Sequence, residues 1–153
     1  MGAEIIQLPI SKKNRRRAED KFGAPVMKLG FTLIPNLLLQ AQGRLKISPV
    51  QLTVLAQLFQ HWWNADDDPF PSKETIARRL GKSERTIQHY LTQLETAKLI
   101  KRVPRFKSHK GQTSNGYDLS GLVVKLAELE PEFTKTAEQK RLKQKKIETA
   151  SGA

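Results

Sequence analysis

The side chains best suited to chemistry in this sequence are polar residues spaced along one predicted helix, 83–96 (SERTIQHYLTQLET). Projected at about 100° per residue from the apolar Ile87, four of them fall within about 40° of the opposite direction, and three more flank these. Such side chains pair with the edges of nucleic-acid bases and with phosphate oxygens. An ordinary surface helix, the alternative, more often carries Glu and Lys pairs four residues apart. The opposite set is Arg85, His89, Thr92 and Thr96, and the flanking set is Thr86, Gln88 and Gln93.

A second helix lies immediately before this one and must help to position it. Ser72 is expected to cap it after Pro71, and Gly81 is expected to end it in the left-handed conformation. Ser83 then caps the polar helix only two residues later. The spacing of apolar residues gives each helix one inward stripe. These stripes are Ile76, Ala77 and Leu80, and then Ile87, Leu91 and Leu94 with Tyr90 beside them.

A third helix, 48–63, is expected to support the pair, with Ser48 as its N-cap and Pro49 at its first position. Its apolar arc of roughly 160° is wider than one neighbouring helix covers, so it must meet a second layer or another subunit. Trp62 and Trp63 lie on this arc, which favours a core or subunit interface over a base-stacking platform. The arc contains Leu52, Leu55, Ala56, Leu58, Phe59, Trp62 and Trp63.

The flanking segments are less regular. Met27, Leu29, Phe31 and Leu33 alternate with polar or small residues, which predicts an N-terminal strand at 26–34 that could form the second layer. A helical turn or two at 36–42 could follow. Beyond Ala97, LIKRVPRF and NGYDL could pair as a hairpin, and 120–129 predicts a short amphipathic helix that ends at Pro131.

Charge indicates a polyanionic partner. The chain has 27 Lys and Arg against 15 Asp and Glu, a formal net charge of +12, which favours nucleic acid or an anionic membrane surface. Six cations and no acidic residue fall between Lys98 and Lys110, where the hairpin is expected. Both ends of the chain add basic runs, one before position 24 and one after position 139. The chain has no cysteine, which excludes disulfide scaffolds and thiol catalysis.

The stretch FPSKETIARRLGKSERTIQHYLTQLETAKLIKR, followed by TSNGYDL, resembles the winged helix-turn-helix domains of bacterial, plasmid and phage regulators and replication initiators. The resemblance covers about 70 residues and implies a mainly α fold with a small β-hairpin wing, an α+β class. It implies that 48–63 is the support helix, 83–96 the recognition helix and 99–119 the wing. Lys98 stands where a Gly is usual in this family, and Gly116 stands where an apolar residue is usual.

The predicted organisation is a flexible basic arm over 1–24, the DNA-binding domain over 25–122, and a short helix with a basic tail over 123–153. Arg85, Gln88 and His89 are expected to contact bases, and the wing cations to contact phosphates. We expect a cytoplasmic, nucleoid-associated homodimer on double-stranded DNA, without cofactor or metal. The full predicted contact set is Ser72, Lys73, Lys82, Ser83, Arg85, Thr86, Gln88, His89, Thr92, Gln93, Lys101, Arg102, Arg105, Lys107 and Lys110.

Other classes of function fit less well. The three histidines lack a ligand spacing, and no nucleophile elbow or phosphate-binding glycine loop occurs, so we expect no enzyme. Asp66, Asp67 and Asp68 are interpreted as a solvated turn rather than a metal site. The tails lack the apolar residues that anchor a helix in lipid, and no aromatic sheet for single-stranded RNA is expected. A transcriptional regulator is favoured over an initiator that binds origin repeats and recruits other proteins through its tails.

Overall fold

The structure is a computed structural model that describes residues 12–109 and 111–150 of the 153 residues. Seven helices and four short strands are formed in these two ranges. The helices are α1 (Lys12–Phe22), α2 (Ala24–Lys28), α3 (Asn36–Gln40), α4 (Pro49–Gln60), α5 (Lys73–Leu80), α6 (Glu84–Thr96) and α7 (Ser120–Thr149). The strands are β1 (Lys101–Val103), β2 (Phe106–Lys107), β3 (Gly111–Gln112) and β4 (Gly116–Asp118).

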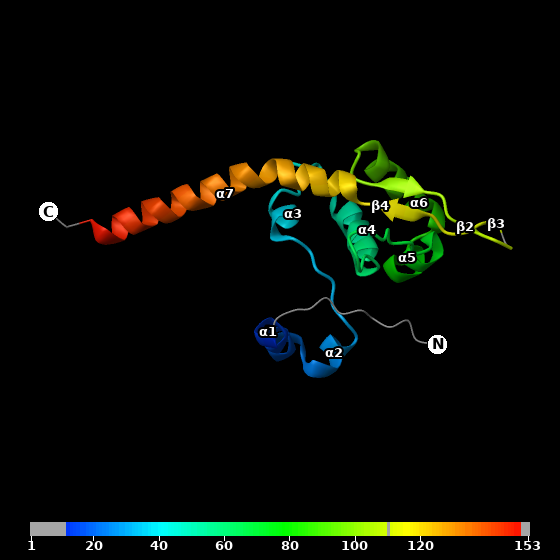
Figure 1. Cartoon of the computed structure of the whole chain (residues 1–153), viewed down its shortest axis with the longest axis horizontal. Coiled ribbons are helices and arrows are strands. Elements are labelled where there is room, and N and C mark those ends of the chain that lie inside the picture. Colours follow the sequence, from blue (N-terminus) through cyan, green and yellow to red (C-terminus); the bar gives the residue numbers. More distant parts are fainter. Residues whose placement is uncertain (1–11, 110, 151–153) are drawn as a thin grey trace.

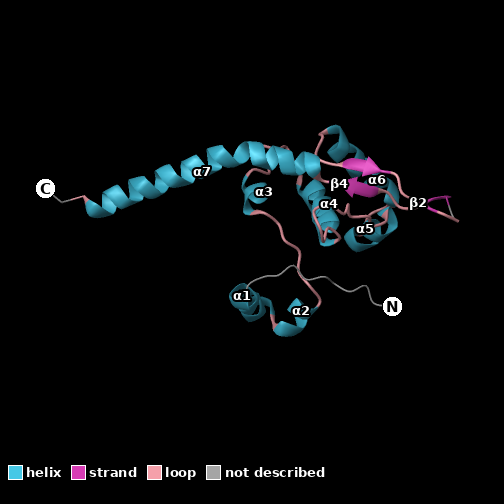
Figure 2. Ribbon diagram, in the orientation of Figure 1, coloured by secondary structure: helices cyan, strands magenta, loops and turns pink. Residues whose placement is uncertain are grey.

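The elements form a compact body with three projections (Figure 1). The body contains α3 to α6, the β1–β4 pair and the start of α7. The β2–β3 tip extends from one end, and the C-terminal part of α7 extends from the other (Figure 2). The helices α1 and α2 lie apart from the body and are joined to it by an extended segment (Figure 1).

The core of the body combines the three helices expected from the sequence with the strands and α7. Ile76 of α5, and Ile87 and Leu91 of α6, are completely buried. The side chain of Tyr117 on β4 closes the core on the wing side, and Leu122 of α7 joins the same cluster. The predicted inward stripes of α5 and α6 are therefore confirmed, with Leu80 and Tyr90 partly buried at the edge.

The N-caps predicted at Ser48, Ser72 and Ser83 are also confirmed, whereas Asn36 lies inside α3 and Pro35 takes the cap position. The hydroxyl of Ser48 accepts the backbone N–H of Gln51 at 3.2 Å, and the Gln51 side chain accepts the N–H of Ser48 at 2.8 Å. This reciprocal pair is a capping box. The helix it opens is shorter than expected, because α4 ends at Gln60 and His61 forms its C-cap. Trp62 still packs against the core from the following turn, whereas Trp63 stays more exposed.

The predicted N-terminal strand is wrong. Gly23 (φ 88°) and Pro25 begin the short helix α2, and residues 29–35 then continue without pairing with any described strand. Within the described residues β1 pairs with β4 and β2 pairs with β3, so no sheet edge reaches this segment. The alternating apolar residues of this segment do not form a buried face either, because Leu29 is 81% exposed and Leu33 is 60% exposed.

The two terminal regions also differ from expectation. The predicted flexible arm is helical over Lys12–Phe22, and α1 contacts α2; residues 1–11 of that arm lie outside the described residues. At the other end α7 runs for 30 residues and contains Pro131, where the sequence predicted its end. An ion pair between Arg44 and Glu132, at 2.7 Å, links α7 beside this proline to the loop after α3. No described helix is long and apolar enough to cross a membrane.

Candidate nucleic-acid interface

The turn between α5 and α6 fixes the angle at which α6 leaves the body. Gly81 adopts the left-handed conformation (φ 65°, ψ 34°) that closes α5, and Lys82 N–H donates to the carbonyl of Ala77 at 2.9 Å. A side chain at Gly81 would have open space around it, so backbone conformation alone explains the glycine. Ser83 then caps α6 by accepting the N–H of Thr86 at 3.1 Å.

The buried and exposed faces of α6 separate as the sequence predicted. Ile87, Leu91 and Leu94 are buried, while Arg85, His89, Thr92 and Thr96 are exposed. Arg85 has no hydrogen-bond or ion-pair partner among the described residues. A guanidinium held on the first turn of an exposed helix is free to form the paired hydrogen bonds that recognise guanine.

Two polar bridges hold the long side chains of α6 in place. Gln51 Nε2 on α4 donates to Gln93 Oε1 at 2.9 Å, and Gln93 Nε2 lies 3.0 Å from His89 Nε2. The support helix α4 is thereby connected through Gln93 to the exposed imidazole. The imidazole of His89 is therefore held by Gln93, and the oxygen of Gln93 already accepts a hydrogen bond from Gln51.

A third bridge defines what Gln88 can offer to a ligand. Lys73 Nζ at the start of α5 donates to Gln88 Oε1 at 2.8 Å. Lys73 takes one of the two lone pairs of this oxygen, so the amide of Gln88 keeps both N–H donors and one acceptor position. The adenine contact expected from the sequence needs both a donor and an acceptor. Gln88 retains both, and the hydrogen bond from Lys73 orients its amide.

The predicted serine contacts are engaged inside the protein. Ser72 Oγ accepts the N–H of Thr75 at 3.0 Å, just as Ser83 Oγ accepts that of Thr86. Each serine hydroxyl also forms a 2.8 Å hydrogen bond with a threonine hydroxyl, Ser72 with Thr75 and Ser83 with Thr86. Their main role in this structure is therefore to begin α5 and α6.

The wing has a regular antiparallel register. Lys101, Arg102 and Val103 face Asp118, Tyr117 and Gly116 in turn. Gly116 stands where the family usually has an apolar residue, but the strand pairing is intact there. The side chains of Arg105 and Asp68 lie close to this glycine. Lys98, where the family usually has Gly, adopts the left-handed conformation itself (φ 60°) and so preserves the turn from α6 into the wing.

Arg102 serves as a link between α6 and the wing. Its Nε donates to Glu95 Oε2 at 2.7 Å, and its backbone N–H donates to the same oxygen at 3.0 Å. These hydrogen bonds hold the pKa of Glu95 below its ordinary value, and the one from the Arg102 side chain has the larger effect. The guanidinium predicted to contact phosphate is thus used within the protein, and its function here is to position the wing.

The other wing cations are differently placed. The guanidinium of Arg105 lies 3.6 Å from the centre of the Phe70 ring, a cation–π contact that fixes it beside the loop before α5. Lys101, Lys107 and Lys82 are exposed, and Lys101 faces Asp118 across the strand pair. Lys110, also predicted to contact phosphate, lies outside the described residues.

Four supporting residues were absent from the predicted set: Gln51, Phe70, Glu95 and Lys125. Lys125 Nζ on α7 donates to the carbonyl of Ala97 at 2.7 Å and so satisfies a backbone acceptor at the end of α6. Gln51 had a local signal in its position three residues after Ser48, which is that of a capping box. The contacts of Phe70 and Lys125 join segments distant in sequence, and that of Glu95 depends on how the wing turns back beside α6, so none of the three carries a local signal.

Two helices are joined at a left-handed glycine, the second has a free polar face, and a hairpin follows them. These features define a winged helix-turn-helix domain, a fold that binds DNA. Comparison with known families agrees: residues 45–100 match the model of the family described as helix-turn-helix domain. No curated protein gives a significant match.

The solved structures similar to the chain include two bacterial proteins. The N-terminal domain of DnaD protein from Geobacillus kaustophilus HTA426 has 21% identity and a TM-score of 0.53, over 79% of this chain and 96% of that one. YusO protein from Bacillus subtilis has 15% identity and a TM-score of 0.41, over 93% of this chain and 100% of that one. At such identity the first similarity shows a shared fold and carries nothing further about function.

Proposed function

We propose that this chain is a sequence-specific DNA-binding protein that regulates transcription by occupying an operator. The observation that carries the proposal is the free polar face of α6, where Arg85, His89 and Thr92 are exposed opposite a fully buried apolar stripe. A helix held in this way fits the major groove, where each base pair presents a distinct set of donors and acceptors.

In this proposal, the bases are contacted by Arg85, Gln88 and His89, with Thr86, Thr92 and Gln93 beside them. Lys73 orients the amide of Gln88 through one hydrogen bond to its oxygen. Phosphates are contacted by the exposed cations Lys82, Lys101 and Lys107 and by the free edge of Arg105, and Lys110 is assigned to the same set from sequence alone. Arg102 is left out because Glu95 holds it.

A dimer would place two α6 helices one helical turn apart, about 34 to 36 Å, on an operator with two-fold symmetry. A replication initiator, the second candidate, would bind directly repeated sites. The observation that favours it is the exposed C-terminal part of α7, which projects from the body and could bind another replication protein (Figure 1).

Selection of duplexes from a random pool tests the proposal and separates these candidates. A palindromic consensus supports the regulator, and tandem direct repeats support the initiator. The selected site is then bound at several salt concentrations by the Lys107→Ala variant. Loss of one phosphate contact should weaken all sequences equally and reduce the salt slope by about 0.9. A pool that yields no consensus sequence would contradict sequence-specific binding.

A further inference from the structure

The N-terminal arm, defined as α1 and α2 (residues 12–28), exposes apolar side chains that the other described residues leave uncovered. Phe22 at the end of α1 is 64% exposed and Val26 of α2 is 57% exposed. The arm stands away from the body (Figures 1 and 2). Isolated helices shorter than about 12 to 15 residues are marginal in water, and α1 and α2 have 11 and 5 residues. The arm therefore needs a surface to pack on.

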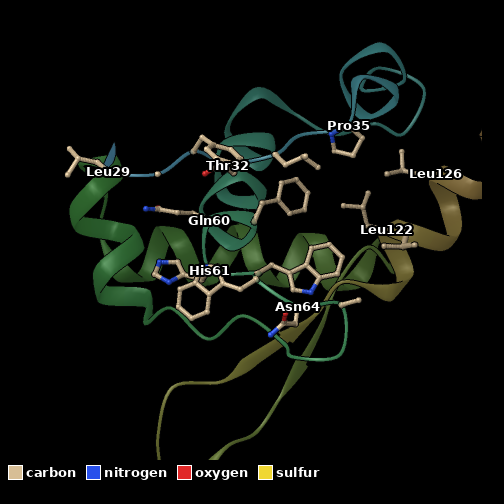
Figure 3. Close-up of a pocket in the computed structure, with 16 residues that line it drawn as sticks. Leu29, Thr32, Pro35, Gln60, His61, Asn64, Leu122 and Leu126 are labelled. Atoms are coloured by element: carbon tan, nitrogen blue, oxygen red, sulfur yellow. The ribbon is translucent and has the colours of Figure 1, made fainter. Parts of the chain in front are cut away.

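An apolar groove of about 430 Å³ lies where the arm joins the body. Figure 3 shows the extended segment that carries Leu29, Thr32 and Pro35 along one side, with Leu122 and Leu126 of α7 at one end. The floor comes from the end of α4 and the turn after it, with Phe59, Trp62 and Trp63. Several apolar groups on the walls, including Phe31, Leu33 and Val123, remain exposed, so the groove is open to a partner.

The arm is basic, and the loop beside the groove is acidic. The exposed cations Lys13, Arg17 and Lys21 recur every four residues along α1 and so form a stripe. The groove borders the loop 66–68, whose three aspartates line an adjoining hollow that shares Trp63 and Asn64 with it. A basic helix with an apolar end matches an apolar groove with an acidic border.

We propose that the groove binds the N-terminal arm of a second copy of this chain, so that two copies exchange arms in a symmetric dimer. Gly30 (φ 102°) provides a joint, and the extended residues 30–35 span roughly 20 Å between arm and body. Exchange of identical elements buries the exposed apolar groups of both copies without any new partner. The inference deepens the dimer of the proposed function and identifies the surfaces that form it.

Sedimentation velocity of the full-length chain without DNA tests this interface, from micromolar to hundreds of micromolar concentrations. The chain should dimerise, whereas the arm variant Phe22→Asp/Val26→Asp and the groove variant Val123→Asp should each sediment as monomers. An equal mixture of the two variants should recover a dimer, because one intact arm then meets one intact groove. The control Ile147→Asp changes an apolar residue on α7 that is more exposed than Val123, and it should leave the dimer unchanged.

Tryptophan fluorescence provides a second measurement, since the only two tryptophans of the chain are Trp62 and Trp63, both in the groove. Emission should shift to longer wavelength on dilution of the wild type, and be shifted at all concentrations in the arm variant. Concentration-independent emission with a monomeric wild type would overturn the proposal and indicate that the groove is filled within one chain. A dimer that survives both variants would also overturn it. Because DNA is absent, either failure leaves the assignment of α6 to DNA untouched.

Discussion

Replacement of Arg85 by Ala should remove discrimination at one base pair while leaving the fold intact. Arg85 is exposed and has no hydrogen-bond or ion-pair partner among the described residues, so its removal should change folding free energy by less than about 0.5 kcal/mol. A paired Arg–guanine contact contributes about 1 to 3 kcal/mol of discrimination. Since about 1.4 kcal/mol is tenfold, affinity for the selected site should fall roughly 5- to 150-fold.

The assay is a competition titration of the selected duplex against its three single-base-pair variants at each position, with wild type and Arg85→Ala at one salt concentration. The variant should become indifferent at one position and keep its preferences elsewhere. Arg141→Ala is a matched control, because it removes the same charge from the exposed part of α7. If Arg85→Ala kept every base preference, or if Arg141→Ala lost one, the assignment of α6 to the major groove would be refuted.

Three further predictions concern the elements that position α6 and the wing. Glu95→Gln should destabilise the protein by up to about 1 kcal/mol near neutral pH, since the Arg102 pair is partly exposed. Folding lowers the pKa of Glu95, so this difference in stability should be present above the pKa of the unfolded state. It should vanish as the pH falls through the pKa of Glu95 in the folded state. Thermal unfolding of both proteins at several pH values checks this. Lys98→Gly should raise stability in urea unfolding by up to about 1 kcal/mol, because it relieves a left-handed non-glycine residue, whereas the exposed Lys107→Gly should not. Gly121→Ala should cost about 1 to 3 kcal/mol or more, because its new methyl group would collide with the carbonyl oxygen of Lys98, and a wild-type urea midpoint would contradict this packing.

The helix-turn-helix core could be predicted because its signals are local. Ser72, Gly81 and Ser83 each determine a helix end through their own backbone and side-chain preferences, and the stripe of Ile87, Leu91 and Leu94 determines which face of α6 is buried. The polar face follows from the same periodicity. Those features need no knowledge of distant partners.

The N-terminal strand and the end of α7 could not be predicted in this way. A strand requires a partner edge, and the alternation around Phe31 gives no information about whether one is available. Pro131 normally ends a helix, but α7 continues through it. The contacts of α7 with α3 and the Arg44–Glu132 pair are tertiary interactions that the local sequence does not reveal. The engagement of Arg102 by Glu95 likewise depends on how the wing packs on α6.

Base analogues in the selected duplex test most directly whether α6 lies in the major groove. Replacement of guanine by 7-deazaguanine removes a major-groove acceptor, and replacement of guanine by inosine removes the minor-groove amino group. Wild type should lose affinity with 7-deazaguanine at the position that Arg85 contacts and be indifferent to inosine there, while Arg85→Ala should be indifferent to both. Sensitivity to inosine alone would show that the protein recognises the minor groove and would contradict the placement of α6.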